Sequence, residues 1–224
     1  MKIVGAVAML GLLTACVSPT PSPSLTPSPI TSTTAPSPSP EPAVAVAERI
    51  VVSTKTITVV ADDETVLAEF GYFQPTIEVV DGLSTYLGDP VDTPFAAHND
   101  SPSATYHDWG GLRLVDTDPP GTAPYDSEHW VRVTGADANG LQVVGPGGVH
   151  VGSALDAASG SDGSEYTNPD TGRTFMSYRL DVVVVEVPWA DSLVPEHNLA
   201  VNIGGYLDTG SVEHIIAPSP NFGA

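Results

Sequence analysis

Residues 50–73 of the chain are IVVSTKTITVVADDETVLAEFGYF. β-Branched residues dominate positions 50–60, a second apolar run covers positions 65–73, and the polar group 61–64 separates the two runs. Such runs on either side of a short polar turn predict a β-hairpin, because β-branched and aromatic side chains pack well on a pleated sheet. This stretch places the chain among the strand-rich folds.

A helix is expected directly after this hairpin. Pro75 precedes apolar residues that are spaced by three and four positions, and the pattern ends at Gly88. A proline at the start of a helix and a glycine just past its end follow the usual asymmetry of helix termini. The apolar positions are Ile77, Val80, Leu83, Tyr86 and Leu87.

The rest of the chain predicts more strands than helices. A shorter second helix is expected from Ser153, where residues 153–156 resemble a capping box, to Gly160. Further strands are predicted at residues 105–115, 130–134, 141–144, 174–187, 199–203 and 212–216, with turn-rich segments between them. The predicted fold class is α+β, strand-rich, with a mainly antiparallel sheet.

The order of these elements suggests two similar halves, each with one short helix. A shift of 70 residues places Val131 on Val201 and Gly140 on Gly210, and the order of a helix, a long strand and two shorter strands recurs. This order is similar to the tandem α+β units of the β-lactamase-inhibitor-protein type, which occur in some secreted inhibitors and bacterial lipoproteins. The resemblance implies an arrangement of elements and assigns no functional residue.

Composition excludes several classes of protein. Seven Lys and Arg residues stand against 27 Asp and Glu residues, for a formal net charge of −20. Such a chain cannot neutralise phosphates over a basic surface, so no nucleic-acid partner is expected. One cysteine excludes a disulfide framework and any zinc or iron–sulfur site built from cysteines. No cofactor is predicted.

The N-terminus has the pattern of a secretory signal. Met1-Lys2 precedes an apolar run at positions 3–13, which is too short for a bilayer span of about 20 residues. The following Leu13-Thr14-Ala15-Cys16 resembles the lipobox of bacterial lipoproteins. The resemblance implies cleavage between Ala15 and Cys16 and a diacylglyceryl thioether on Cys16, so that the membrane becomes a partner through this lipid. An ordinary signal peptide cleaved elsewhere is the alternative.

A linker is expected to separate the anchor from the folded part. Of the 27 residues at positions 17–43, 21 are Pro, Ser or Thr, a composition that favours polyproline II and cannot pack a core. The predicted organisation is a signal peptide at 1–15, a lipidated cysteine and tether at 16–43, and one globular domain at 44–224. An extracytoplasmic location follows, with the protein held at the cell membrane by its lipid.

Known catalytic signatures are absent from the sequence. There is no G-x-S-x-G elbow, no H-E-x-x-H, no P-loop and no G-x-G-x-x-G. Asp116, Asp118, Asp126 and Glu128 could offer oxygen ligands to calcium, but their spacing matches no EF-hand, and solvated carboxylates are expected instead.

One group of residues suggests a binding face. If residues 105–115 form one strand, its alternation places His107, Trp109 and Arg113 together, while Trp130 and Arg132 share a face of the next strand. Arg179 joins them from the matching strand of the second half. Arginine and tryptophan commonly anchor binding surfaces. The alternative is that both tryptophans pack into the core and the arginines pair with nearby carboxylates.

These observations favour a lipid-anchored, non-catalytic binding domain whose partner is an envelope protein or a glycan. The rival hypothesis is an extracytoplasmic hydrolase with a site in the loops at 89–104, 116–129 or 188–198. A structural component of the envelope is a third hypothesis. A buried histidine or carboxylate with a strongly shifted pKa in a deep pocket would favour the hydrolase.

Overall fold

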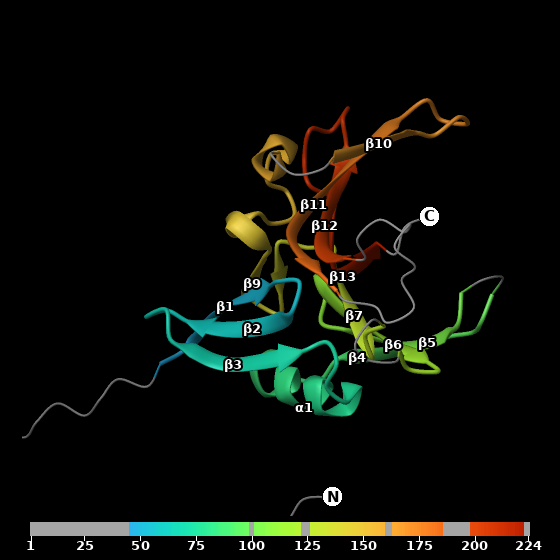
Figure 1. The fold of residues 1–224 in the computed structure, drawn as a ribbon. Coiled ribbons are helices and arrows are strands. Elements are labelled where there is room, and N and C mark those ends of the chain that lie inside the picture. Colours follow the sequence, from blue (N-terminus) through green and yellow to red (C-terminus); the bar gives the residue numbers. More distant parts are fainter. Residues whose placement is uncertain (1–44, 99–100, 122–125, 160–162, 186–197, 222–224) are drawn as a thin grey trace, which may run out of the picture. The chain divides into compact units, whose positions relative to one another are not determined.

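The computed structural model describes residues 45–98, 101–121, 126–159, 163–185 and 198–221 (Figure 1). The chain divides into Met1–Pro42 and Ala43–Ala224, and all described residues belong to the second unit. The elements in chain order are β1 (Ala47–Val52), β2 (Thr56–Ala61), β3 (Val66–Gly71), α1 (Thr76–Leu87), β4 (Val91–Phe95), β5 (Ser103–Asp108), β6 (Leu112–Asp118), β7 (His129–Val133), β8 (Asp137–Ala138), β9 (Leu141–Val144), η1 (Pro146–Gly148), η2 (Leu155–Ala158), β10 (Gly163–Thr167), β11 (Thr174–Val184), β12 (Asn198–Tyr206) and β13 (His214–Asn221).

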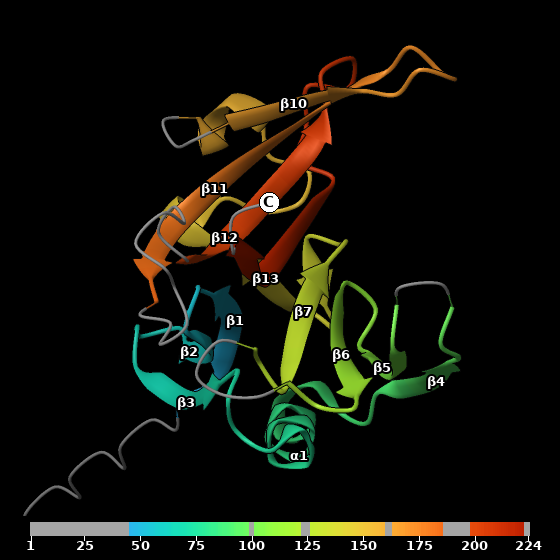
Figure 2. The ribbon, with the colours of Figure 1, turned by 45° about the vertical axis from the view of Figure 1, so that its right-hand side comes forward.

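The strands form two sheets. The first has five strands in the order β3-β2-β1-β9-β8, and the second has eight in the order β10-β11-β12-β13-β7-β6-β5-β4 (Figure 2). Among the described strands, β1 and β9 pair in parallel and the other pairs are antiparallel. The prediction of a strand-rich, mainly antiparallel fold is confirmed. The described part is mostly β, because the second predicted helix is the short 3₁₀ segment η2.

Helix α1 lies between the positions that its flanking residues predict, with Pro75 before it and Gly88 after it. It buries Val79, Val80, Leu83 and Leu87, whereas Ile77, the first apolar position of the predicted pattern, is 65% exposed. No described helix has the length and apolar character needed to cross a membrane.

Gly82, in the middle of α1, has a packing role. A Cβ atom built on it would lie 2.3 Å from the Phe70 ring, so this glycine lets the ring of β3 rest against the helix backbone. The last carbonyls of the helix are also satisfied by distant residues. The indole Nε1 of Trp109 donates to the Gly88 oxygen and the Asn139 amide donates to the Leu87 oxygen, both at 2.8 Å.

Two segments that were each predicted as one continuous strand, residues 50–60 and 105–115, are hairpins of two strands in the structure. Residues 50–60 contain a turn at Ser53, whose hydroxyl accepts hydrogen bonds from the Lys55 and Thr56 amides. Residues 105–115 contain the turn Gly110-Gly111 between β5 and β6, in which Gly110 has φ of 88°. A Cβ atom on Gly111 would lie 1.9 Å from the Asp137 oxygen. Glycines at this turn were the missed signal, since Gly-Gly between apolar runs is typical of hairpins.

The core lies between the two sheets and α1. It joins Ile50 and Ile57 of the first sheet, Leu83 of the helix, and Leu114 and Ile203 of the second sheet in one buried cluster. A hydrogen bond also joins the sheets directly, because the Thr54 amide donates to the Asp181 carboxylate at 2.8 Å. Asp181, with φ of 53°, occupies an irregularity in the pairing of β11 with β12.

Candidate binding face

The two faces of the eight-stranded sheet carry different side chains. Leu112, Leu114, Val131 and Val133 are fully buried and belong to the core cluster. Because successive strand residues point to opposite faces, the residues between them point away from the core. We call this second side of the eight-stranded sheet the outer face.

Three arginines of the predicted binding face lie in one row across the outer face. The strand register pairs Asp108 with Arg113, Arg113 with Arg132, Arg132 with Ile216, Ile216 with Asn202, and Asn202 with Arg179. The row therefore crosses β5, β6, β7, β13, β12 and β11. Five spacings between neighbouring strands give it a length of ~24 Å. The strand register therefore places Arg113, Arg132 and Arg179 of the predicted face in one row.

The arginines of this row differ in their partners. Arg113 donates to the Asp108 carboxylate at 2.7 and 3.0 Å, and its guanidinium lies 5.0 Å from the Tyr106 ring centre. Arg179 donates to Asn198 Oδ1 at 2.7 Å and to the Ser219 oxygen.

Arg132 is exposed, and within the described residues its side chain forms no hydrogen bond or ion pair. It also lies directly opposite Arg113, an arrangement of like charges that destabilises a sheet. An exposed guanidinium in this position is available for an anionic partner.

An aromatic cluster lies beside the row, towards β11 and β12. The Phe175 ring stacks on His214 at 5.3 Å and meets Tyr206 edge-on at 5.4 Å, and the Arg173 guanidinium lies 3.7 Å from the Tyr206 ring centre. The Phe175 ring can take this position only because residue 204 is a glycine: a Cβ atom on Gly204 would lie 2.3 Å from the ring. Sequence reasoning missed Phe175, although alternation on the predicted strand 174–187 places it on the same face as Arg179.

The electrostatics of Arg132 extend to this cluster. Partial burial lowers the pKa of His214 below its ordinary value, and the nearby positive charge of Arg132 lowers it further. Glu213 acts in the opposite direction but more weakly. The pKa of His214 is therefore sensitive to the charge of Arg132.

Trp130 borders a pocket at one end of the outer face. The pocket has a volume of about 610 Å³, and Ile216 contributes to its wall. Five prolines complete much of the lining: Pro102, Pro119, Pro120, Pro218 and Pro220. Ile216 is also the register partner of Arg132, so the pocket and the arginine row share a residue. Trp130 is half-buried.

Two residues of the predicted face lie elsewhere, because residues 105–115 turn back as a hairpin. Trp109 is 1% exposed and belongs to the core. His107 pairs with the buried Leu114, so it lies on the core face, where its Nδ1 is 2.7 Å from the Asp92 carboxylate. Trp109 thus packs in the core, as the alternative interpretation expected.

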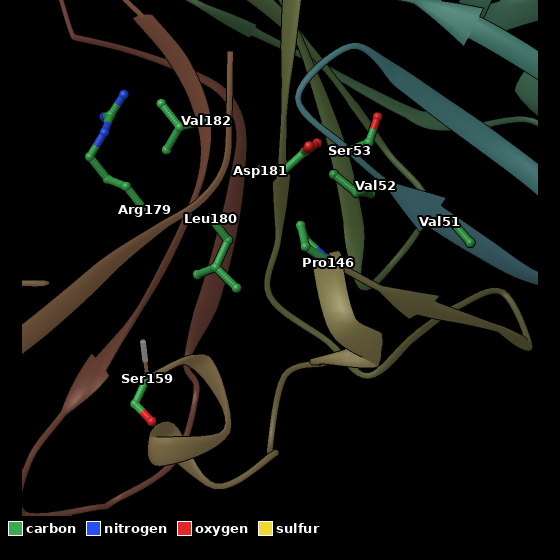
Figure 3. A pocket seen from close by; sticks show the side chains of 9 residues that line it. All are labelled: Val51, Val52, Ser53, Pro146, Ser159, Arg179, Leu180, Asp181 and Val182. Atoms are coloured by element: carbon green, nitrogen blue, oxygen red, sulfur yellow. The ribbon is translucent and has the colours of Figure 1, made fainter. Parts of the chain in front are cut away.

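A second pocket, of about 690 Å³, lies where β1 and β11 approach each other (Figure 3). Leu180 and Pro146 contribute apolar surface, and the Arg179 side chain points away from them in the view. The one carboxylate among the described lining residues of this pocket, Asp181, already accepts a hydrogen bond from the backbone N–H of Thr54. None of the nine described residues that line it is a histidine or cysteine, so no described imidazole stands beside Ser53 or Ser159 as a base.

Buried His129 has the most strongly shifted pKa among the histidines of the described segments. Burial lowers it to about 4, with a smaller contribution from His107. Its Nε2 has no hydrogen-bond partner, and its Nδ1 lies 3.4 Å from the Thr76 hydroxyl. His129 lies in the packed interior and borders neither pocket described above, so it does not provide the accessible base that a hydrolase needs.

The described segments contain no group of three or more His, Cys, Asp or Glu side chains arranged to hold a metal ion. The predicted lipidation and cleavage residues, Cys16 and Ala15, lie outside the described residues, as does the tether. The same applies to residues 188–197 of one proposed hydrolase loop and to 122–125 of the acidic loop.

Comparison with known proteins gives no further guide. No family model matches the chain, and no curated protein or solved structure matches it significantly.

Proposed function

We propose that this protein is an extracytoplasmic lipoprotein, held at the cell membrane by fatty chains on Cys16, whose folded domain binds a partner without catalysis. The outer face of the eight-stranded sheet is the binding face. The observation that carries the proposal is the row from Asp108 to Arg179, which contains Arg132, an exposed arginine without a side-chain partner among the described residues.

The distribution of charge supports this face. Four of the seven Lys and Arg residues, Arg113, Arg132, Arg173 and Arg179, lie on or beside it in a chain of net charge −20. Aromatic rings and arginines together are the residues that dominate binding energy in protein interfaces.

The lipid anchor is supported by the sequence Leu13-Thr14-Ala15-Cys16. Mass spectrometry of the native protein tests it: we expect an N-terminal Cys16 that carries a diacylglyceryl group. A Cys16→Ser chain should then leave the membrane fraction. Recovery of unmodified Cys16 from the membrane would contradict the anchor.

Binding through the outer face is tested by photo-crosslinking in intact cells. A photoreactive phenylalanine analogue at position 202, which pairs with Ile216 in the row and leaves Arg132 intact, should give a discrete crosslinked product. The same analogue at position 77 is the control, because Ile77 is 65% exposed on α1, away from this face. Equal products at both positions, or none at position 202, would exclude the outer face as the binding site.

We also infer that the two halves of the sheet are structurally equivalent. Strands β4–β7 and β10–β13 each form a four-stranded meander after a helical segment, and their last strands, β7 and β13, pair antiparallel. This equivalence aligns β7 with β13, whereas the 70-residue shift aligned Val131 with Val201 of β12. A measured structure in which the two meanders fail to superpose in this order would refute it.

A further inference from the structure

We propose that the outer face recognises a protein segment that presents a carboxylate to Arg132 and, beside it, an apolar side chain to the Trp130 pocket. The inference rests on the proposed function and adds the chemistry of the partner. It concerns two anchors, one polar and one apolar, that are neighbours in the sheet.

The geometry places these anchors within reach of one short segment. Trp130 and Arg132 are two residues apart on β7 and point to the same side, so their Cα atoms are ~6.6 Å apart. Ile216 lies opposite Arg132 and lines the same pocket as Trp130. An acidic and an apolar residue one turn apart on a helix, or two apart on a strand, have a comparable separation.

The charged groups of the face favour a carboxylate. Arg132 has no hydrogen-bonded or ion-pair partner among the described residues, and a guanidinium matches a carboxylate by two parallel hydrogen bonds. Asp108, the carboxylate in the row, is already bound to Arg113. The row therefore offers donors for an anion and few free acceptors for the hydroxyl groups of a neutral glycan.

The dimensions of the face favour a protein over a small ligand. The row is ~24 Å long, which is close to the side of a square patch of ~800 Å², the area that each partner buries in a typical protein complex. The pocket of about 610 Å³ is lined by Trp130, Ile216 and five prolines, and it can take an aromatic or large aliphatic side chain; Asp126 also lines it, so the partner's carboxylate is expected at Arg132 and not in the pocket. A buried apolar anchor beside a charge-assisted hydrogen bond is typical of interface hot spots.

The test uses the full chain in lipid nanodiscs and a phage-displayed library of random dodecapeptides. Peptides selected on the wild-type protein should contain Asp or Glu close to an aromatic or aliphatic residue. For a synthetic copy of a selected peptide, Arg132→Gln should weaken binding roughly 10- to 100-fold, because a hydrogen bond to a charged group is lost. Replacing the peptide's acid by its amide should weaken binding equally, and the two changes together should add little more.

Matched variants identify the cause of any loss. Lys55→Gln removes the same charge from an exposed turn of the other sheet and should leave binding unchanged. Arg132→Lys keeps the charge but removes the paired donors, so an intermediate loss is expected. Ile216→Ser should weaken binding through the pocket, and thermal unfolding of each variant verifies that it is folded.

The outcomes separate the inference from the proposed function. If Ile216→Ser weakens binding but Arg132→Gln does not, the outer face binds but the carboxylate is refuted. If neither variant matters, or no peptide is selected, the inference fails, and crosslinking at position 202 decides whether the proposed function fails with it. An oligogalacturonate that displaces the peptide and binds as tightly through Arg132 would refute a protein partner in favour of an acidic glycan.

Discussion

The two faces of the eight-stranded sheet obey the same alternation but meet different requirements. On the core face Leu112, Leu114, Val131 and Val133 are fully buried against the other sheet and α1. On the outer face the intervening positions include the exposed Arg132, which stands opposite another arginine. The core face holds the fold together, and the outer face keeps an arrangement that costs stability, which is common at functional sites.

Removing Trp109 should give the largest loss of stability. Trp109→Ala opens a cavity in the core and leaves the Gly88 oxygen without its indole donor, so we expect a loss of about 3–5 kcal/mol in the free energy of unfolding. Urea denaturation measures it. Trp130→Ala, on the outer face, should lose roughly 1–2 kcal/mol because its ring is only half-buried. Equal losses would mean that both tryptophans belong to the core.

Acid should act on the core face through His129. Its pKa is about 4 in the folded protein, against 6.5 for an ordinary histidine, so the unfolded chain binds more protons between these values. Stability is therefore fully present above pH 6.5 and falls by about 3 kcal/mol as the pH drops to 4.

Urea denaturation across that range measures the effect of His129, with His129→Leu as the comparison. This variant removes the titrating group from a site that is closed to solvent, so its stability should fall less steeply between pH 6.5 and 4. Parallel profiles for the two proteins would show that His129 is not the cause.

A methyl group at Gly204 should act on the outer face alone. Gly204→Ala places a carbon where the Phe175 ring lies, so the ring must move away from His214 at a cost of roughly 1–3 kcal/mol. Proton NMR of the His214 ring should show loss of the shift that stacking on Phe175 produces. The control is Ser177→Ala on β11. A second glycine such as Gly140 does not serve as a control, because its φ of 92° would strain an alanine.

Neutralising Arg132 should have the smallest effect on stability. Arg132→Gln removes an exposed charge that faces Arg113, so the free energy of unfolding should change by no more than about 0.5 kcal/mol. The pKa of His214 should rise towards its ordinary value, because a nearby positive charge that lowers it is gone. NMR titration of His214 measures the shift, and an unchanged pKa would separate Arg132 from the aromatic cluster.

Some parts of this structure could be predicted from local pattern. Pro75 and Gly88 bounded α1, since helix termini depend on backbone properties of single residues. The hairpin at Gly110-Gly111 could also have been predicted from its two glycines. Treating residues 105–115 as one strand instead placed Trp109 and His107 on the wrong face. A one-residue turn error reverses every later assignment on that strand, because side chains alternate with a period of two.

The sequence by itself determined the strand-rich class, the position of α1 and the acidic character of the chain, because composition and local spacing express these directly. Only the tertiary structure decided that Arg132 stands between Arg113 and Ile216, and that Arg179 lies in the same row. Strand pairing brings together residues that are tens of positions apart, and its register is set by the packing of the whole sheet, which no local pattern contains.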